Sequence, residues 1–595
     1  MLSGVCGIGG VISADPAWSA PEAMLAAMDR RLRHRGPDDS RTARMPGGAL
    51  ISRRLAILDP EHSRQPLTDC SGAVTVVYNG EIYNYRELRR ELDAAGHVFR
   101  TNGDGEVIPH LYETYGAAFP RRLRGAFAIA VYDHRADRLV LARDRLGEKP
   151  LVYAVADDRF FFASEMRAIV PWTGGRISAA AIDQYLHYGY VLEPSTVFAN
   201  IAKVPAGTVM VLDRSAPFEP RITEYWSAPA LEEGDGPVAA MAEGFATAVA
   251  QQLNADVPTA VALSDGVDST LMAETAARCV PRLRTYNVVF GWMPDVPEAA
   301  VPSATARRIG AAHTVVELSP ERYAALLAEG AAGLSEPIAD WTMPAYLGMT
   351  DRCRQDGVRV LLTGHGPDEL FLAYDWARAA LRSLGGGGTD GGSPRHDAYL
   401  FNPEYREARI FAEIVLEDRA ARKGGTAFTA PLVRTGNRTR SDLRQQLAAG
   451  YLRSNGLLQL DALGLRKEVE VRLPYVDHRF VEAAIRADQR VTPDQGNPKS
   501  LLYEMGTALG IDLPVIPKRP FFPKLKGVDT LVTALAGSAL PAGALAGGGA
   551  VSQRGVTRLL DTVKGTGAGL TVMYRLLVLE LWLRSLGKPV GGPQP

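Results

Sequence analysis

Cysteine is scarce in this sequence, which has only four among 595 residues: Cys6, Cys70, Cys279 and Cys353. They lie far apart, so they form neither the framework of a disulfide-rich domain nor the paired spacing of a metal site. Such usage is typical of a reducing compartment. We therefore expect a cytoplasmic location.

The chain also lacks an excess of charge of either sign and a long apolar run. Its formal net charge is −1, with 46% hydrophobic and 22% charged residues. This balance argues against nucleic acid or a membrane as partner. Residues 1–5 have no signal-peptide pattern, and the apolar stretch from Val572 to Leu583 is interrupted by Arg575 and Glu580. We interpret that stretch as a packed helix.

The length exceeds what one hydrophobic core usually organises, so two domains are expected. Residues 6–213 alternate short β-rich runs with turns and a few helices, one over residues 84–95, which indicates an α+β domain. Residues 214–236 carry several prolines and glycines, and we interpret them as a linker. Residues 237–585 follow the order strand, turn, helix, which predicts an α/β domain with a parallel sheet. The glycine-rich run 385–393 predicts a surface loop.

The first domain carries a series of short motifs. A cysteine near the start of a strand is more often a buried core residue than a nucleophile, so Cys6 alone indicates little. It is followed, however, by His34-Arg35-Gly36-Pro37-Asp38, Arg54-Leu55-Ala56-Ile57, Asn79-Gly80-Glu81-Ile82-Tyr83-Asn84, Asp104-Gly105-Glu106-Val107 and the segment from Ala142 to Pro150. In this order and spacing the set resembles the class II glutaminase domain of asparagine synthetases, which has the sandwich fold of N-terminal-nucleophile (Ntn) hydrolases.

The resemblance implies a role for each of these residues. Cys6 would attack the glutamine amide, with its own α-amine as the base, and release ammonia through a thioester. Asn79 and the Gly80 backbone N–H would stabilise the oxyanion. Arg54 would bind the glutamine α-carboxylate, and Asp104 with Glu81 the α-ammonium.

Five residues precede Cys6, and an amide nitrogen cannot serve as that base. Three explanations are open. The leader is removed, or translation starts at Val5, or the glutaminase is silent and free ammonia is used. Because the glutamine-binding residues are all retained, we favour removal or a misassigned start.

The second domain contains the turn Ser264-Asp265-Gly266-Val267-Asp268-Ser269-Thr270 between an apolar run and a helical stretch. It resembles the pyrophosphate loop of ATP pyrophosphatases, which presents backbone N–H groups and a helix N-terminus to phosphate. Further motifs match asparagine synthetases in order: Glu336 to Asp340, Thr363 to Phe371, Leu460 to Leu463, Glu470 to His478, Lys499 to Leu502 and Pro517 to Phe521.

This resemblance implies ATP and Mg²⁺ as cofactors, with an acyl-adenylate that ammonia converts to an amide. Asp268 and Asp368 would hold Mg²⁺, and Lys518 would neutralise charge at the α-phosphate. Val288 and Gly364 would line the adenine and ribose region. The expected ATP site as a whole comprises Ser264, Asp265, Gly266, Asp268, Ser269, Val288, Thr363 and Gly364.

Three positions depart from the family pattern. Asp265 replaces a glycine, and one repelling charge pair at roughly 5 Å costs about 3 kcal/mol at an effective dielectric constant near 20. His365 replaces an acidic residue, and a functional change to a histidine base is as well supported as a structural role. Leu372-Ala373 replaces a glycine pair, which we expect to fill space at the mouth of the site.

We therefore predict a glutamine- and ATP-dependent ligase that converts a carboxylate to an amide, with an acceptor acid from specialised metabolism in place of aspartate. Ordinary asparagine synthesis is the first alternative, and a degenerate synthetase with a regulatory or partner role is the second. Intramolecular amide formation is a third, although enzymes of that kind commonly lose the glutaminase motifs. A homodimer is compatible with the resemblance, and the oligomeric state is left open.

Overall fold

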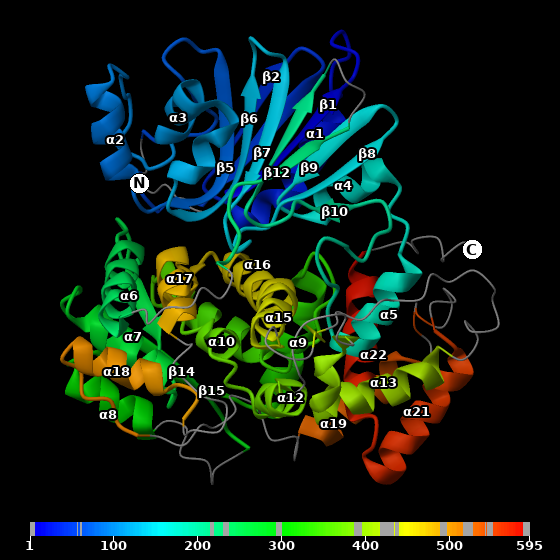
Figure 1. Cartoon of the computed structure of the whole chain (residues 1–595). Helices are drawn as coiled ribbons and strands as arrows, with labels where there is room; N and C mark the ends of the chain where they lie inside the picture. The colour runs from blue at the N-terminus through cyan, green and yellow to red at the C-terminus, as the bar shows by residue number, and fades with distance from the viewer. Residues whose placement is uncertain are drawn as a thin grey trace.

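The computed structural model describes residues 6–55, 57–59, 62–214, 219–229, 237–292, 300–385, 395–416, 433–434, 439–487, 497–515, 528–541, 543, 545 and 551–586. Two antiparallel sheets form the first part of the chain, and a parallel sheet surrounded by helices forms the second (Figure 1). This is the predicted order of an Ntn-type α+β sandwich followed by an α/β domain, so the fold class is confirmed.

The two antiparallel sheets each have six strands within the described residues. The first has the order β10-β8-β9-β1-β3-β2 and the second β12-β11-β7-β6-β5-β4. Their strands are β1 (Cys6–Ser13), β2 (Asp39–Met45), β3 (Gly48–Arg54), β4 (Leu67–Thr68), β5 (Val74–Ile82), β6 (Gly125–Asp133), β7 (Arg138–Arg143), β8 (Val152–Ala156), β9 (Arg159–Ala163), β10 (Ala202–Lys203), β11 (Thr208–Asp213) and β12 (Arg221–Glu224).

The alternation of side chains along these strands builds the sandwich. In β1, Ile8 and Ile12 enter the core between the sheets, whereas Val11 faces the opposite side. In β5, Val77 enters that same core, and Val76 packs on the outer face. Successive residues of a strand point to opposite faces, so each sheet contributes side chains to the core between the sheets and to a second apolar layer on its outer face.

Helices cover the outer faces of the sandwich. Those on the first sheet are α1 (Glu22–Leu32), the short turn η1 (Arg33–Arg35) and α4 (Met166–Thr173); those on the second are α2 (Tyr85–Ala94), α3 (Val107–Tyr115) and η2 (Gly116–Arg122). Helix α2 matches the helix predicted over residues 84–95. Its apolar residues Leu88 and Leu92, four positions apart, are buried on one face.

Strand β12 corrects the predicted linker. It lies inside residues 214–236 and pairs with β11, so the second sheet continues past residue 213. The proline- and glycine-rich composition concealed a strand of four exposed residues, which has no apolar alternation to reveal it. Residues 215–218 and 230–236 of the predicted linker lie outside the described residues.

The parallel sheet has the order β15-β14-β13-β16-β19. Its strands are β13 (Thr259–Ala262), β14 (Arg284–Phe290), β15 (Ala312–Leu318), β16 (Val360–Leu362) and β19 (Glu470–Arg472). Ala260 and Val261 of β13 pack into different apolar clusters, one on each face of the sheet. A parallel sheet needs such cover on both faces. The strand order also places the carboxyl ends of β13 and β16 side by side, which brings their following loops together.

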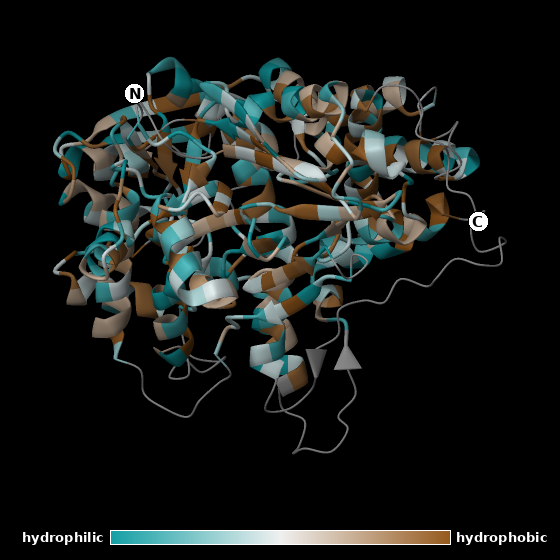
Figure 2. Cartoon of the chain, turned by 90° about the horizontal axis from the view of Figure 1, so that it is seen from above, coloured by the Kyte–Doolittle hydropathy of each residue, from teal (hydrophilic) through white to brown (hydrophobic). Residues whose placement is uncertain are grey.

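Helices account for most of the remaining chain. They are α5 (Ala179–Tyr188), α6 (Val238–Gln252), α7 (Val267–Ala277), α8 (Ala300–Arg308), α9 (Pro320–Gly333), α10 (Met343–Gln355), α11 (Pro367–Leu370), α12 (Asp375–Gly385), η3 (Ala398–Phe401), α13 (Pro403–Val415), α15 (Thr439–Leu447), the π-helix η4 (Ala448–Leu457), α16 (Leu458–Arg466), η5 (Pro474–Val476), α17 (His478–Ala487), α18 (Ser500–Ala508), α19 (Val528–Ala539), α21 (Gln553–Thr566) and α22 (Leu570–Ser585), besides the small pair β17 (Arg395–His396) and β18 (Val433–Arg434). Hydrophobic and hydrophilic residues alternate along many of these helices (Figure 2). The predicted loop 385–393 begins at the end of α12, and its residues 386–393 lie outside the described residues.

Helix α22 confirms the interpretation of the late apolar stretch. It is buried on nearly all sides, as expected for a helix inside a large core. The two charges that interrupt the stretch are satisfied there. Arg575 donates to the carbonyl oxygens of Leu186 and His187, and Glu580 accepts from the backbone N–H of Leu545. Among the described helices, none is both long and apolar enough to cross a membrane.

Helix α5 crosses between the two halves. By sequence it belongs to the first half, yet it contacts α13 and α22 of the second. The hydroxyl of Tyr185 donates to the carbonyl oxygen of Arg575 at 2.7 Å. The two halves therefore share a core.

Candidate active sites

Cys6 opens β1 and lies beside Arg54, its partner in the register with β3. Its side chain is fully buried, and its Sγ accepts a hydrogen bond from Gln65 Nε2 at 3.2 Å. Burial raises the pKa of the thiol to about 12, although Arg54 opposes the shift. The site therefore holds a thiol that needs a base. Residues 1–5 lie outside the described residues.

The predicted oxyanion donors lie next to this thiol. The backbone N–H of Cys6 donates to Asn79 Oδ1 at 3.1 Å, so the amide of Asn79 is held by its oxygen. The other end, Nδ2, is buried without a hydrogen-bond partner within the described residues. Gly80 has φ +141°, and a Cβ there would lie 2.0 Å from the Ala126 carbonyl oxygen. Only glycine fits this backbone, so its position beside Asn79 depends on the missing side chain.

The predicted glutamine-binding carboxylates lie close together and are buried. Asp104 accepts hydrogen bonds from the Tyr78 hydroxyl at 2.7 Å and the Ile82 N–H at 2.8 Å. Burial nevertheless raises the pKa of Asp104 to about 6, and burial with the nearby Asp104 raises the pKa of Glu81 well above its usual value. An ammonium group placed here would restore both charges. Arg54 is buried beside them and donates to the Asp59 carbonyl oxygen at 2.9 Å.

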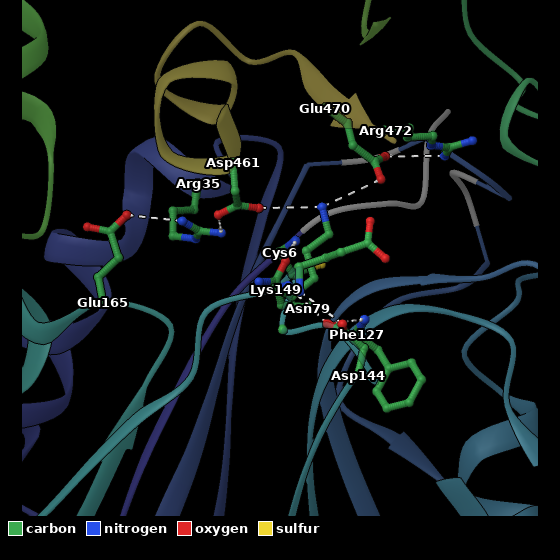
Figure 3. Close-up of polar contacts among 12 residues, drawn as sticks. Cys6, Arg35, Asn79, Phe127, Asp144, Lys149, Glu165, Asp461, Glu470 and Arg472 are labelled. Atoms are coloured by element: carbon green, nitrogen blue, oxygen red, sulfur yellow. Dashed lines mark hydrogen bonds and ion pairs between the residues drawn. The ribbon is translucent and has the colours of Figure 1, made fainter. Parts of the chain in front are cut away.

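A buried chain of ion pairs leads from this site into the second domain (Figure 3). Its successive contacts are Glu165–Arg35 at 3.2 Å, Arg35–Asp461 at 2.6 Å, Asp461–Lys149 at 3.4 Å, Lys149–Glu470 at 3.8 Å, Glu470–Arg472 at 3.2 Å and Arg472–Glu81 at 3.3 Å. Each side chain that takes part in these ion pairs is at most 4% exposed. Charges so buried are stable only when each keeps its partners.

The predicted pyrophosphate loop follows β13 and ends at the start of α7. The hydroxyls of Ser264 and Ser269 lie 2.9 Å apart, and Ser269 Oγ also donates to the Gly266 carbonyl oxygen at 3.1 Å. The loop borders a cavity of about 990 Å³. All predicted ATP-site residues line this cavity: Ser264, Asp265, Gly266, Asp268, Ser269, Val288, Thr363 and Gly364.

Two predicted metal ligands share a lysine. Lys499 Nζ contacts Asp268 Oδ2 and lies 2.8 Å from Asp368 Oδ1. Although burial lowers the pKa of Lys499, the two carboxylates raise it above its usual value. The carboxylates therefore converge on one positive charge at the cavity wall. Oxygen donors arranged in this way suit Mg²⁺.

His365 lies in the cavity wall with both ring nitrogens engaged. Nε2 lies 2.7 Å from the Tyr346 hydroxyl, and Nδ1 lies 3.1 Å from Thr363 Oγ1. Burial lowers the pKa of His365 to about 4, so the ring is neutral near pH 7. A neutral ring cannot supply the negative charge of the acidic residue that it replaces.

The structure shows how the replaced residues fit, and it corrects the expectation for Leu372 and Ala373. Asp265 does not have a positive φ, so the loss of glycine leaves the turn unstrained. Leu372 and Ala373 are buried and do not border the cavity; Leu372 packs with Tyr188 and Tyr190. Leu372 keeps a left-handed φ of +51°, a conformation that suits glycine and costs a leucine about 1–2 kcal/mol. Tyr374, which follows Ala373 in the sequence, does line the cavity.

The sequence did not single out several residues that the fold brings to these sites. Gln65 contacts the Cys6 thiol, Tyr346 contacts His365, and Arg472 contacts Glu81. Arg472 and Lys499 stood within recognised motifs but had no assigned role. Lys518, predicted to act on the α-phosphate, lies outside the described residues.

Comparisons with known proteins agree with this architecture. Residues 5–226 match the family described as glutamine amidotransferase domain, and residues 240–584 match the family described as asparagine synthase. A Bacillus subtilis asparagine synthetase [glutamine-hydrolyzing] 1 is 29% identical over 536 residues, which cover 84% of this chain and 83% of the relative. A putative asparagine synthetase [glutamine-hydrolyzing] of Mycobacterium tuberculosis is 31% identical over 540 residues, which cover 81% and 82%. The chain therefore belongs to the glutamine-hydrolysing asparagine synthetase family and is an ATP-dependent carbon–nitrogen ligase that takes its nitrogen from glutamine.

Proposed function

We propose that this enzyme amidates a carboxylic acid larger than aspartate, an acid of specialised metabolism. The observation that carries the proposal is an aromatic wall in the 990 Å³ cavity, made of Tyr188, Tyr374, Trp376, Tyr405 and Tyr451. The rings of Tyr374 and Trp376 are stacked with centroids 6.1 Å apart, and Tyr451 lies 5.9 Å from Tyr374. The volume is near the upper end of the range of about 300–1,000 Å³ for ligand sites.

The aromatic wall is joined to the reacting end of the cavity. The Tyr374 hydroxyl donates to Glu369, the neighbour of the predicted metal ligand Asp368. On the other side, Tyr451 donates to Asp340 Oδ2 at 3.3 Å. An acid whose body rests on this wall would present its carboxylate toward the phosphate loop. Broad aromatic surfaces favour apolar or planar ligands over aspartate, a small amino acid with two carboxylates and an ammonium group.

In the first half-reaction, glutamine would lie between Arg54 and the pair Asp104–Glu81. Cys6 Sγ would attack the amide carbon, and Asn79 Nδ2 with the Gly80 N–H would receive the oxyanion. The base would be the Cys6 α-amine, exposed by removal of the leader or, with a translation start at Val5, by removal of that single residue. That nitrogen already lies 3.1 Å from Asn79 Oδ1, which would orient its lone pair.

In the second half-reaction, Ser264, Ser269 and the N-terminus of α7 would bind the pyrophosphate of ATP. Asp268 and Asp368 would hold Mg²⁺, which would offset the phosphate charge, and Lys499 would stand beside it. The acceptor carboxylate would attack the α-phosphate with loss of pyrophosphate, assisted by Lys518. Ammonia would then displace AMP, and His365 would exchange one of its contacts, with Tyr346 or Thr363, for a hydrogen bond that orients the reacting carbonyl without adding a charge.

The test is ATP–pyrophosphate exchange with a panel of acids that includes aspartate, other small diacids and aromatic acids, followed by mass spectrometry of the amide formed with glutamine. We expect exchange with larger acids and little with aspartate. Fast formation of asparagine and AMP would instead support ordinary asparagine synthesis, the second candidate, which the family membership favours. Absence of ATP binding in calorimetry with Mg²⁺ present would contradict both.

A matched pair of variants sharpens the test. His365→Glu restores an acidic residue, as the family has at this position. His365→Gln replaces the imidazole ring with a neutral amide that can still form hydrogen bonds. If the neutral hydrogen bond is what the acceptor requires, His365→Gln should retain more exchange than His365→Glu. The reverse order would mean that the position needs charge.

A further inference from the structure

Two histidines and a glutamate lie together in the amidotransferase domain, outside the residues assigned to either active site. His97 follows α2, and His110 and Glu113 lie on α3; Figure 1 shows both helices at the edge of the domain. One donor atom from each residue lies within 4.8 Å of the other two. Because His110 and Glu113 are three positions apart on a helix, their side chains share one face.

His110 is buried but lacks partners for its polar atoms. It is 1% exposed, and neither ring nitrogen has a hydrogen-bond partner within the described residues. Leaving such a buried group unpaired costs about 1–3 kcal/mol. Its ring centroid lies 5.0 Å from that of His97, so the unpaired nitrogens belong to the cluster.

The hydrogen bonds of Thr114 define the tautomer of His97. The Thr114 hydroxyl donates its one proton to the His110 carbonyl oxygen at 2.9 Å, so it accepts from His97 Nε2 at 3.1 Å. In the neutral ring Nδ1 then carries a lone pair, and it faces Glu113 Oε2 at 3.7 Å. Two lone pairs that face each other require a cation between them.

A proton on His97 Nδ1 would satisfy that nitrogen and Glu113 but would leave His110 unpaired. A metal ion would satisfy all three residues at once. We propose that His97, His110 and Glu113 bind a transition-metal dication, for which zinc is the best match. Two imidazole nitrogens and a carboxylate oxygen are a common zinc donor set, with a water molecule as the fourth ligand. Thr114 would serve as the outer partner that fixes the His97 ring.

The electrostatic field of nearby carboxylates also favours a cation between His97, His110 and Glu113. Besides Glu113, the carboxylates of Glu106 and Asp69 lie near enough to act on His110. The metal would tie the segment after α2 to α3. That segment leads to Asp104, so the ion would hold the approach to a glutamine-binding residue, and its role would be structural.

The experiment uses the full-length protein after treatment with a chelator and desalting. Zinc is added in a competitive titration against a chromophoric indicator, and bound metal is measured by plasma mass spectrometry. We expect one tightly bound zinc per chain and an increase in the thermal unfolding midpoint with zinc. Cobalt in place of zinc should give the visible absorption of a tetrahedral site with nitrogen and oxygen ligands.

Three variants assign the site. His110→Gln should abolish the tight binding of zinc. Glu113→Gln changes a side chain that is 31% exposed, and it should weaken zinc binding by about tenfold or more. His134→Gln removes a histidine of the same domain outside the cluster and should bind zinc as the wild type does. Equal zinc binding by all variants, or no binding tighter than that of the indicator, would overturn the proposal, and circular dichroism confirms that each variant is folded.

Discussion

Arg472 of the parallel sheet lies 3.3 Å from Glu81, a residue of the predicted glutamine site in the other domain. Both side chains are buried, and Arg472 also pairs with Glu470 at 3.2 Å. One guanidinium therefore compensates carboxylates of both domains. Together with Lys149, it makes the glutaminase site electrostatically dependent on the synthetase domain.

Arg472→Met should destabilise the enzyme and weaken glutamine binding. The change leaves Glu81 and Glu470 buried without their cation, and breaking such a pair costs about 3–5 kcal/mol. We expect a lower thermal unfolding midpoint and a higher KM for glutamine. Arg354→Met, which removes a surface pair with Glu468, is the matched control and should change stability by at most about 1 kcal/mol. Equal effects of both changes would contradict the dependence.

Gly80→Ala should abolish glutamine-dependent activity while ammonia-dependent activity persists. A Cβ at this φ of +141° would lie 2.0 Å from a backbone oxygen, so the predicted oxyanion donor must shift. The measurement compares product formation with glutamine and with ammonium salts. Gly537→Ala, at a helical position with nothing within 4 Å of the added Cβ, should leave both activities intact. Loss of the ammonia-dependent reaction in Gly80→Ala would indicate a wider structural effect.

The efficiency kcat/KM for glutamine should fall as the pH drops through about 6. Burial raises the pKa of Asp104 to about 6, and its protonated form cannot pair with an α-ammonium group. The contribution of Asp104 to folding stability changes with pH in the opposite direction. Because its pKa is raised in the folded state, this contribution is fully present below the unfolded pKa and is lost as the pH rises through 6. A pH profile for glutamine hydrolysis checks the first effect. In Asp104→Asn the acidic limb should disappear and KM should be high at every pH.

Lys499→Met should impair the ATP reaction but not glutamine hydrolysis. The change removes the positive charge that Asp268 and Asp368 share, which leaves two carboxylates facing the phosphates. We expect the KM for ATP to rise by about tenfold or more, in line with the loss of a charge-assisted contact worth about 1.5–3 kcal/mol. Lys467→Met removes a lysine paired with Glu329 and Asp351 outside the cavity and should have no such effect. A loss of glutaminase activity in Lys499→Met would argue against this division.

The mass of the purified native protein should correspond to a chain that begins at Cys6. The Cys6 nitrogen can act as a base only as a free amine. Mass spectrometry of the intact protein, together with a glutaminase assay, is the measurement. Full glutaminase activity in a protein that retains residues 1–5 would refute the free-amine mechanism.

Much of this architecture was predictable because the motifs lie at the ends of strands, where the fold positions them. The loop at Ser264 and the segment at Thr363 follow neighbouring strands, and both reach one cavity as the pattern predicted. The strand β12 was missed because its four residues are exposed and carry no alternation. Arg472 was recognised only as part of a motif, since pairing with Glu81 depends on how two domains pack.

The expected effect of the glycine replacements was wrong for a similar reason. A sequence pattern shows that Leu372 and Ala373 are larger than glycine, but it does not show which side of the chain they face. Both side chains are buried, and Leu372 enters a core with Tyr188 and Tyr190. The cavity is instead lined by aromatic residues from several parts of the chain, among them Tyr188, Tyr374 and Tyr451.

Helix α5 sets a limit on how this enzyme can be divided. A gene cut near residue 214 would leave α5 on one fragment, while its partners α13 and α22 would be encoded on the other. Neither fragment would fold with a closed surface, because each would expose an apolar face and unpaired charges that are buried in the intact chain. A truncation designed to isolate one catalytic activity should therefore yield insoluble protein, so point substitution is the better way to separate the two.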